Sequence, residues 1–84
     1  MNNIIEFTEV LVKELVKNED MVTVKEFASD TESEETVIQI MVDDTDMGAL
    51  IGREGKTANA IRTVVQVAAY KMGIKKVKIN IDSF

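Results

Sequence analysis

The residues best placed to bind a ligand lie in one segment, Leu50-Ile51-Gly52-Arg53-Glu54-Gly55-Lys56. Gly52 and Gly55 stand three residues apart, and glycine lets a turn bring its backbone close to a ligand. A strongly helical pattern begins at Lys56, so the loop ends where unpaired amides and the helix dipole favour an anion. Arg53 and Lys56 place two cations beside that point. The segment therefore predicts a phosphate-binding site.

Two nucleotide-binding motifs resemble this segment, and both fail at Leu50. Gly55-Lys56-Thr57 matches the end of the P-loop pattern G-x-x-x-x-G-K-[ST], but that pattern requires glycine at position 50. The dinucleotide pattern G-x-G-x-x-G requires glycine at the same position. A P-loop also follows a buried strand, whereas a short apolar helical turn precedes this loop. These motifs are therefore excluded, and the phosphate of a nucleic-acid backbone remains.

Composition excludes most catalytic chemistry. The 84 residues include no cysteine and no histidine, which removes disulfides, thiolate nucleophiles, the common zinc sites and the usual general base near neutral pH. We expect no enzyme, no metal site and no cofactor, and one domain over residues 1–84. Charged residues interrupt the first twenty positions, so we expect neither a signal peptide nor a membrane span, and a cytoplasmic protein.

The net charge of −5 hides a strong asymmetry along the chain. Residues 1–46 carry three lysines against thirteen acidic residues, whereas residues 47–84 carry seven basic residues against Glu54 and Asp82. A nucleic acid responds to the local field rather than to the overall charge. The basic half either contacts nucleic acid or forms a solvated face, and charge alone leaves both interpretations open.

Helices and strands that could position the loop follow from hydrophobic periodicity. Asn3 and Glu6 form a capping-box pattern at the start of a first helix, and apolar spacing continues through Leu15 and Val16. The alternating segments predict strands, the first two pairing antiparallel. The expected elements are helices over 3–18, 47–51 and 56–72 and strands over 21–28, 36–42 and 76–82.

Three strands cannot bury an apolar face alone, so the helices are expected to pack on one side of the sheet. The predicted fold class is α+β, in the order α-β-β-α-α-β, with a three-stranded sheet.

The loop, the helices beside it and this element order resemble the KH domain family, type II, over the whole chain. The run from Ile51 to Val65 is similar to the short bacterial single-KH proteins of the KhpA type. The resemblance implies non-catalytic binding of single-stranded RNA through the GxxG loop and an adjacent apolar groove, with low sequence specificity, in an RNA-chaperone or post-transcriptional regulatory role. We assign the groove to Gly48, Ile51, Ala58 and the second strand near Ile40. The candidate RNA-binding residues are Gly48, Ile51, Gly52, Arg53, Glu54, Gly55, Lys56, Asn59 and Arg62.

Several alternatives stay open at this point. The family also implies a protein-interaction module that pairs with itself or with a larger Jag-type KH partner. Gly48 can instead allow close packing, and Arg62 and Lys78 can belong to a solvated face. Glu54 departs from the basic residues common in this loop and should weaken phosphate binding. The four aromatic residues lie away from the loop in sequence, so no stacking platform is expected at the loop.

Overall fold

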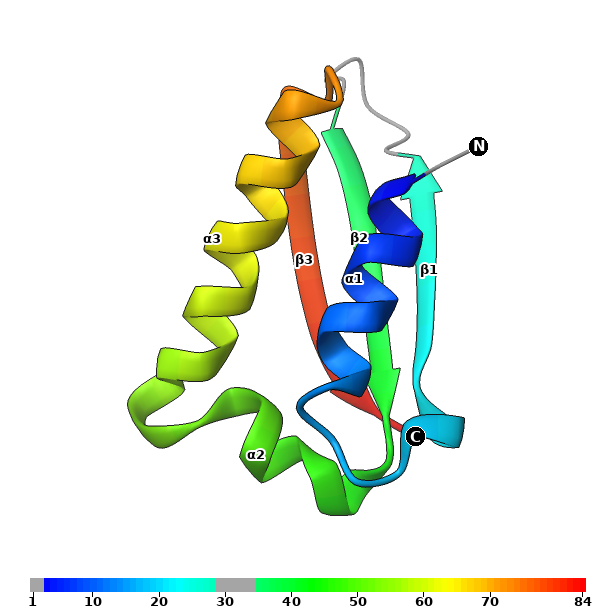
Figure 1. Ribbon diagram of the computed structural model, residues 1–84, viewed down its shortest axis with the longest axis vertical. Coiled ribbons are helices and arrows are strands. Elements are labelled where there is room, and N and C mark those ends of the chain that lie inside the picture. The colour runs from blue at the N-terminus through cyan, green and yellow to red at the C-terminus, as the bar shows by residue number, and fades with distance from the viewer. Residues whose placement is uncertain (1–2, 29–34) are drawn as a thin grey trace.

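The computed structural model describes residues 3–28 and 35–84, which form a three-stranded sheet with helices on one face (Figure 1). The order of helices and strands is α-β-β-α-α-β, as predicted for a type II KH fold. Short 3₁₀ turns connect several of the elements. The elements are α1 (Asn3–Lys13), β1 (Thr23–Ala28), β2 (Glu35–Val42), α2 (Met47–Ile51), α3 (Lys56–Lys71) and β3 (Lys76–Ser83), with 3₁₀ turns at Glu19–Met21, Asp44–Asp46 and Arg53–Gly55.

The sheet has the strand order β1-β2-β3 and mixes two kinds of pairing. β1 pairs antiparallel with β2, as predicted, and places Val24 opposite Ile40. β2 pairs parallel with β3, which places Ile40 opposite Ile81. Parallel neighbours need a long crossover, and α2 and α3 supply it. The loop between these helices is therefore held by a crossover that packs against the sheet.

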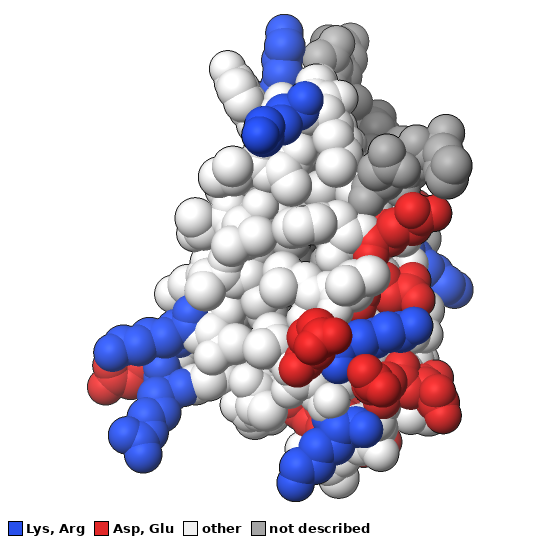
Figure 2. All heavy atoms as spheres, in the orientation of Figure 1, with Lys and Arg blue, Asp and Glu red and all other residues white. Residues whose placement is uncertain are grey.

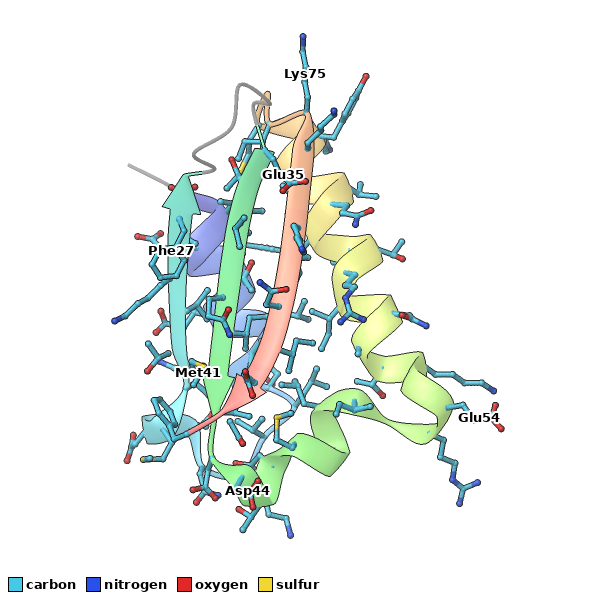
Figure 3. All side chains as sticks on the ribbon, turned by 180° about the vertical axis from the view of Figure 1, so that it is seen from behind. Phe27, Glu35, Met41, Asp44, Glu54 and Lys75 are labelled. Atoms are coloured by element: carbon cyan, nitrogen blue, oxygen red, sulfur yellow. The ribbon has the colours of Figure 1, made fainter. Side chains whose placement is uncertain are left out.

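Alternation along the strands divides the sheet into a core face and an open face. Ile38, Ile40 and Val42 are fully buried under the helices. Ile61 and Val65 of α3 complete the same core. The residues between them in β2 point away from the helices, toward the side seen in Figure 3. No helix of the described chain covers that second face.

The first helix is shorter than predicted. Its apolar pattern extends to Val16, but α1 ends at Lys13. The backbone amides of Lys17 and Asn18 instead donate to the carboxylate of Asp46, at 3.1 Å each. These bonds replace helical ones and direct the chain toward the start of α2.

The buried stripe of α1 also differs from the predicted one. Thr8 is fully buried, and its hydroxyl donates to the carbonyl of Ile4 at 2.7 Å. Phe7 and Leu15 follow Ile4 at helical spacing, which predicts a place in the core, but they are 38% and 40% exposed. A threonine whose hydroxyl is hydrogen-bonded within its own helix can occupy a core position. A prediction from polarity alone therefore places the buried face at Phe7 instead of Thr8.

The other boundaries agree closely with the prediction. α3 ends one residue early. The apolar spacing of this helix predicts that Met72 continues the buried stripe, but Met72 is 45% exposed and Ala69 is buried instead. Gly73 is the helix stop: its φ is +88°, and Ile74 N–H donates to the carbonyl of Ala69 at 2.9 Å. The side chain of Asn3, and so the capping box, lies outside the described residues. The polar stretch over 29–35 predicts an exposed connection between strands; residues 29–34 also lie outside the described residues, whereas Glu35 is half-buried and begins β2.

Candidate nucleic-acid interface

Gly52 fixes the shape of the loop between α2 and α3. Its φ of +74° and ψ of 179° lie in a region that is nearly restricted to glycine. A Cβ at this position would lie 2.7 Å from the Cβ of Thr57 and 2.9 Å from its backbone nitrogen. Both distances are shorter than real contacts, so the first turn of α3 presses against a position that only glycine can fill.

The two residues at the end of the loop also have positive φ. Gly55 has a φ of +76°, and Glu54, with +55°, is the only non-glycine residue in the described chain with this conformation. A left-handed backbone costs a residue with a side chain on the order of 1 kcal/mol. A Cβ on Gly55 would meet nothing closer than the Asn59 amide nitrogen at 4.0 Å. The space beside Gly55 is therefore open to a ligand.

The loop presents donors and cations to solvent. Gly55 is the N-cap of α3 and offers no side-chain cap to the amides of the first turn. Arg53, Glu54 and Lys56 are exposed around that turn. Figure 2 shows basic side chains and an acidic one projecting together at the lower left, and Figure 3 labels Glu54 at the same corner. The arrangement suits a phosphate at the helix N-terminus, with Glu54 acting against it.

A buried carboxylate positions α2 and was missed in the sequence. Asp46 is only 3% exposed and accepts hydrogen bonds from Lys17 N, Asn18 N and Asn18 Nδ2 at 3.0–3.1 Å. Burial raises the pKa of Asp46, but these hydrogen bonds outweigh that effect and hold the pKa below its ordinary value. The sequence indicates Asp46 only as one of several helix-cap residues over 43–46, because nothing in the local pattern points to a partner 28 residues away.

The two candidates on α2 are accessible. Ile51 is 40% exposed, and Gly48 is exposed with no atom within 4 Å of where a Cβ would lie. Close packing therefore does not explain Gly48. The groove prediction was wrong for Ile40 and Ala58, which are 0% and 4% exposed. Ile40 lies in the central strand, which has a neighbour on each side and no free edge.

The candidates on α3 lie together on one flank of the helix. Asn59 and Arg62 are one turn apart, and Arg62 Nη1 donates to Asn59 Oδ1 at 3.3 Å. Asn59 is exposed and Arg62 is half-buried. Lys56 joins them to the loop at the start of the helix. The exposed or half-buried candidates thus follow one another from α2 through the loop to the first two turns of α3.

An apolar hollow of about 330 Å³ lies on the opposite flank of α3, between α3 and α1. Only Lys56 belongs both to this hollow and to the candidate RNA-binding set. Figure 2 shows the uncharged surface that covers the helical layer there, between the charged corners. The α1–α3 hollow, as we call it, is lined by Leu11, Leu15, Lys56, Thr57, Ala60, Ile61 and Val64.

Other kinds of site are not found in the described residues. No group of histidine, cysteine, aspartate or glutamate side chains there could hold a metal ion. None of the described helices has the length and apolarity needed to cross a membrane.

Comparison with known proteins identifies the family. The family model of the KhpA/KhpB KH domain matches residues 5–81. RNA-binding protein KhpA of Aquifex aeolicus is 38% identical over 82 residues, which is 96% of this chain and 98% of that protein. RNA-binding protein KhpA of Clostridium perfringens is 40% identical over 76 residues, 90% and 96% of the two chains. The protein of the same name from Streptomyces coelicolor is 38% identical over 77 residues, 92% of each. The chain therefore belongs to the KhpA/KhpB family of KH domains.

Proposed function

We propose that this protein binds single-stranded RNA without catalysis, holding the backbone of about four nucleotides at the loop from Gly52 to Gly55. The observation that carries the proposal is the conformation of Gly52. It sets a loop path that leaves the first-turn amides of α3 without a side-chain cap, beside Arg53 and Lys56. The names of the relatives support RNA as the ligand. The chain is not an enzyme, because its family consists of RNA-binding proteins.

The residues divide the work of binding between backbone and bases. Arg53 and Lys56 neutralise phosphates, and the first-turn amides of α3 donate hydrogen bonds to them. Ile51 and the open surface at Gly48 contact bases. Asn59 and Arg62 extend this surface along α3. No aromatic side chain lies in this set, and most of these contacts reach the backbone, so sequence specificity is low. Such binding suits an RNA chaperone or a post-transcriptional regulator in the cytoplasm.

Opposite charge changes at neighbouring positions test the proposal. Arg53→Asp replaces a charge-assisted contact with repulsion and should weaken binding about ten-fold or more. Glu54→Lys removes repulsion and adds a cation, so binding should tighten. The dependence of log affinity on log salt concentration should also steepen by about 0.7 for the added contact. Titration of a labelled uridine-rich or adenine-rich oligomer at two salt concentrations measures both effects.

The folded state gives the control for this experiment. Arg53 and Glu54 are exposed, so the thermal midpoint should barely change in either variant. A change in RNA affinity without a change in the thermal midpoint then reports the loss or gain of a contact with RNA and not unfolding. Equal affinities for the wild type and both variants would mean that the loop does not hold RNA.

The α1–α3 hollow favours a second function, pairing with another protein. It contains apolar side chains that a domain of this size leaves uncovered, including Leu15 at 40% and Val64 at 44% exposure. A second copy of this chain, or a larger Jag-type KH protein, would cover it. Because the hollow and the Asn59–Arg62 flank lie on opposite sides of α3, pairing through the hollow leaves that flank and Arg53 free, and only Lys56 borders both surfaces.

A further inference from the structure

The open face of the sheet has a composition that neither proposed function explains. The helices cover the opposite face, and the strands present an uncovered surface in Figure 3, where Phe27 and Met41 are labelled. Phe27 is 51% exposed. Register and alternation place on this face, from β1, β2 and β3, residues Thr23, Lys25, Phe27, Glu35, Val37, Gln39, Met41, Lys76, Lys78, Asn80 and Asp82.

Two cross-strand rows form the centre of the open face. In one row Phe27 lies opposite Val37, which lies opposite Lys78. In the next row Lys25 lies opposite Gln39, which lies opposite Asn80. Neighbouring strands are about 4.8 Å apart, so each row brings its three side chains within reach of one small planar group. The centre thus combines an aromatic ring, two cations and two amides.

The charge of this centre differs from that of the whole molecule. The protein carries a net charge of −5, but the two central rows contain Lys25 and Lys78 and no acidic residue. The acidic residues of the face lie at its ends, where Glu35 is opposite Lys76 and Asp82 is opposite Met41. The centre is therefore a local positive area that attracts an anionic ligand.

A second copy of the chain fits this face poorly. Two open faces brought together would bury Lys25 and Lys78 in a contact whose central rows contain no acid to pair with them. A single-stranded nucleic acid satisfies the same groups. Its bases stack on an aromatic ring, its phosphates pair with lysines, and amide side chains hydrogen-bond to base edges.

We propose that the open face of the sheet is a second surface for single-stranded RNA, with a base stacked on Phe27 and phosphates held by Lys25 and Lys78. The inference rests on the proposed function, since it takes the ligand of the loop to be RNA. Gln39 and Asn80 contact the edges of the same or the next base. The stacking surface absent from the loop is thus supplied by the opposite layer of the molecule.

The position of the two surfaces determines how RNA length affects binding. The loop belongs to the helical layer, whereas the open face lies on the other side of the sheet. An oligomer of about four nucleotides fills the loop alone. A strand of about sixteen nucleotides, the upper end of the range for a single nucleic-acid-binding fold, can pass around the molecule and engage both surfaces. Engagement of both raises affinity through effective concentration.

The test compares uridine oligomers of about four and about sixteen nucleotides. Phe27→Ala and Lys78→Glu should leave the affinity for the short oligomer within two-fold of wild type, roughly the scatter of such titrations, and weaken the long one about five-fold or more. Lys71→Glu is the matched control, because it makes the same charge change at an exposed lysine in the last turn of α3. It should weaken neither oligomer to that extent. The thermal midpoint of Lys78→Glu should be unchanged, since Lys78 is exposed. Phe27 is 51% exposed, so Phe27→Ala loses some packing, and a thermal melt checks that this variant is folded at the titration temperature.

Ultraviolet crosslinking of the long oligomer gives an independent measurement. It should attach RNA to the peptide that contains Phe27, and this attachment should survive in Arg53→Asp, whose loop is impaired. Wild-type affinity of both sheet variants for the long oligomer, or no crosslink at Phe27, would overturn the inference while leaving the loop proposal intact. Failure of the loop proposal has a different result: Arg53→Asp would then bind the short oligomer as well as wild type.

Discussion

Gly52 and Gly55 share a positive φ but differ in what a side chain at each position would meet. At Gly52 a Cβ would press against Thr57, and the backbone lies in a region nearly closed to other residues. At Gly55 the space is open, and only the left-handed conformation itself is unfavourable. The two glycines of the motif therefore have separate roles: Gly52 sets the path of the loop, and Gly55 leaves room beside it.

We expect alanine to affect these glycines unequally. Gly52→Ala should destabilise the protein by about 3 kcal/mol or force the loop to rearrange, and RNA affinity should fall strongly. Gly55→Ala should cost about 1 kcal/mol and retain most of the affinity. Gly73→Ala is the control, because it has the same kind of φ at +88° but lies at the other end of α3. Gly73→Ala should lower the thermal midpoint as Gly55→Ala does, without changing RNA binding. Thermal melts and titration of an RNA oligomer compare the three alanine variants.

The sequence indicated where the loop lies but not the conformation of its residues. The spacing of Gly52, Gly55 and the two cations predicted a phosphate site there, which remains a prediction. The positive φ of Glu54 was not predictable, because glutamate has no preference for it and the surrounding loop imposes it. The contact between Gly52 and Thr57 was also missed, since only the folded turn brings these positions together.

At the scale of elements, α1 and α2 are coupled through Asp46. The apolar period of the first helix continues past Lys13, and a rule based on periodicity extends the helix accordingly. The carboxylate of Asp46 offers the amides of Lys17 and Asn18 better partners, so a tertiary interaction ends the helix. Such an ending cannot be read from a local window of sequence.

Replacing this carboxylate should loosen α2 and therefore the loop that follows it. In Asp46→Asn the amide nitrogen faces N–H donors, so the thermal midpoint at pH 7 should fall and RNA affinity with it. Asp44→Asn is the matched control, because Asp44 is exposed and its carboxylate accepts a 3.4 Å hydrogen bond from Ser83 Oγ. It should melt like wild type. An unchanged midpoint in Asp46→Asn would contradict the positioning role.

The same carboxylate predicts how stability depends on pH. The pKa of Asp46 is lower in the folded protein than its ordinary value of 3.8. Its contribution is therefore complete above that value and is lost as the pH falls through the lowered pKa. Between pH 7 and about pH 3 the wild type should lose more of its thermal midpoint than Asp46→Asn, which has no carboxylate to protonate. Parallel loss in both proteins would show that other carboxylates dominate acid unfolding.

Gly48 offers a test of α2 as a contact surface. It lies in a helix without positive φ and with space for a side chain, so Gly48→Ala should stabilise the protein by about 0.5–1 kcal/mol through helix propensity. A larger side chain extends from the same open Cβ position and should project over the surface next to Ile51. Gly48→Leu should therefore melt no lower than wild type and bind RNA several-fold more weakly. Full RNA affinity in Gly48→Leu would remove Gly48 from the interface.

At the scale of the whole molecule, the two proposed functions depend on the separation of the loop and the Asn59–Arg62 flank from the α1–α3 hollow. The sequence predicted the fold class, the order of elements and the single layer of helices from periodicity and from the need to cover three strands. It did not predict that β3 joins β2 in parallel, since register depends on pairing between distant segments. It also could not separate the Asn59–Arg62 flank of α3 from the hollow on its other side.

This separation predicts that assembly and RNA binding can be lost independently. A monomer leaves the α1–α3 hollow uncovered, so sedimentation at concentrations on the order of tens of micromolar should show a dimer. Leu15→Glu places a charge in the hollow, at a position already 40% exposed, and should give a folded monomer. That monomer should still bind a short oligomer, but a long one more weakly, because linked copies bind a strand more tightly than one. Arg53→Asp should have the opposite effects: it should remain a dimer and bind RNA more weakly.

Two outcomes would contradict this assembly. A wild-type protein that sediments as a monomer would leave only a different KH protein to cover the hollow, and a Leu15→Glu dimer would place the interface elsewhere.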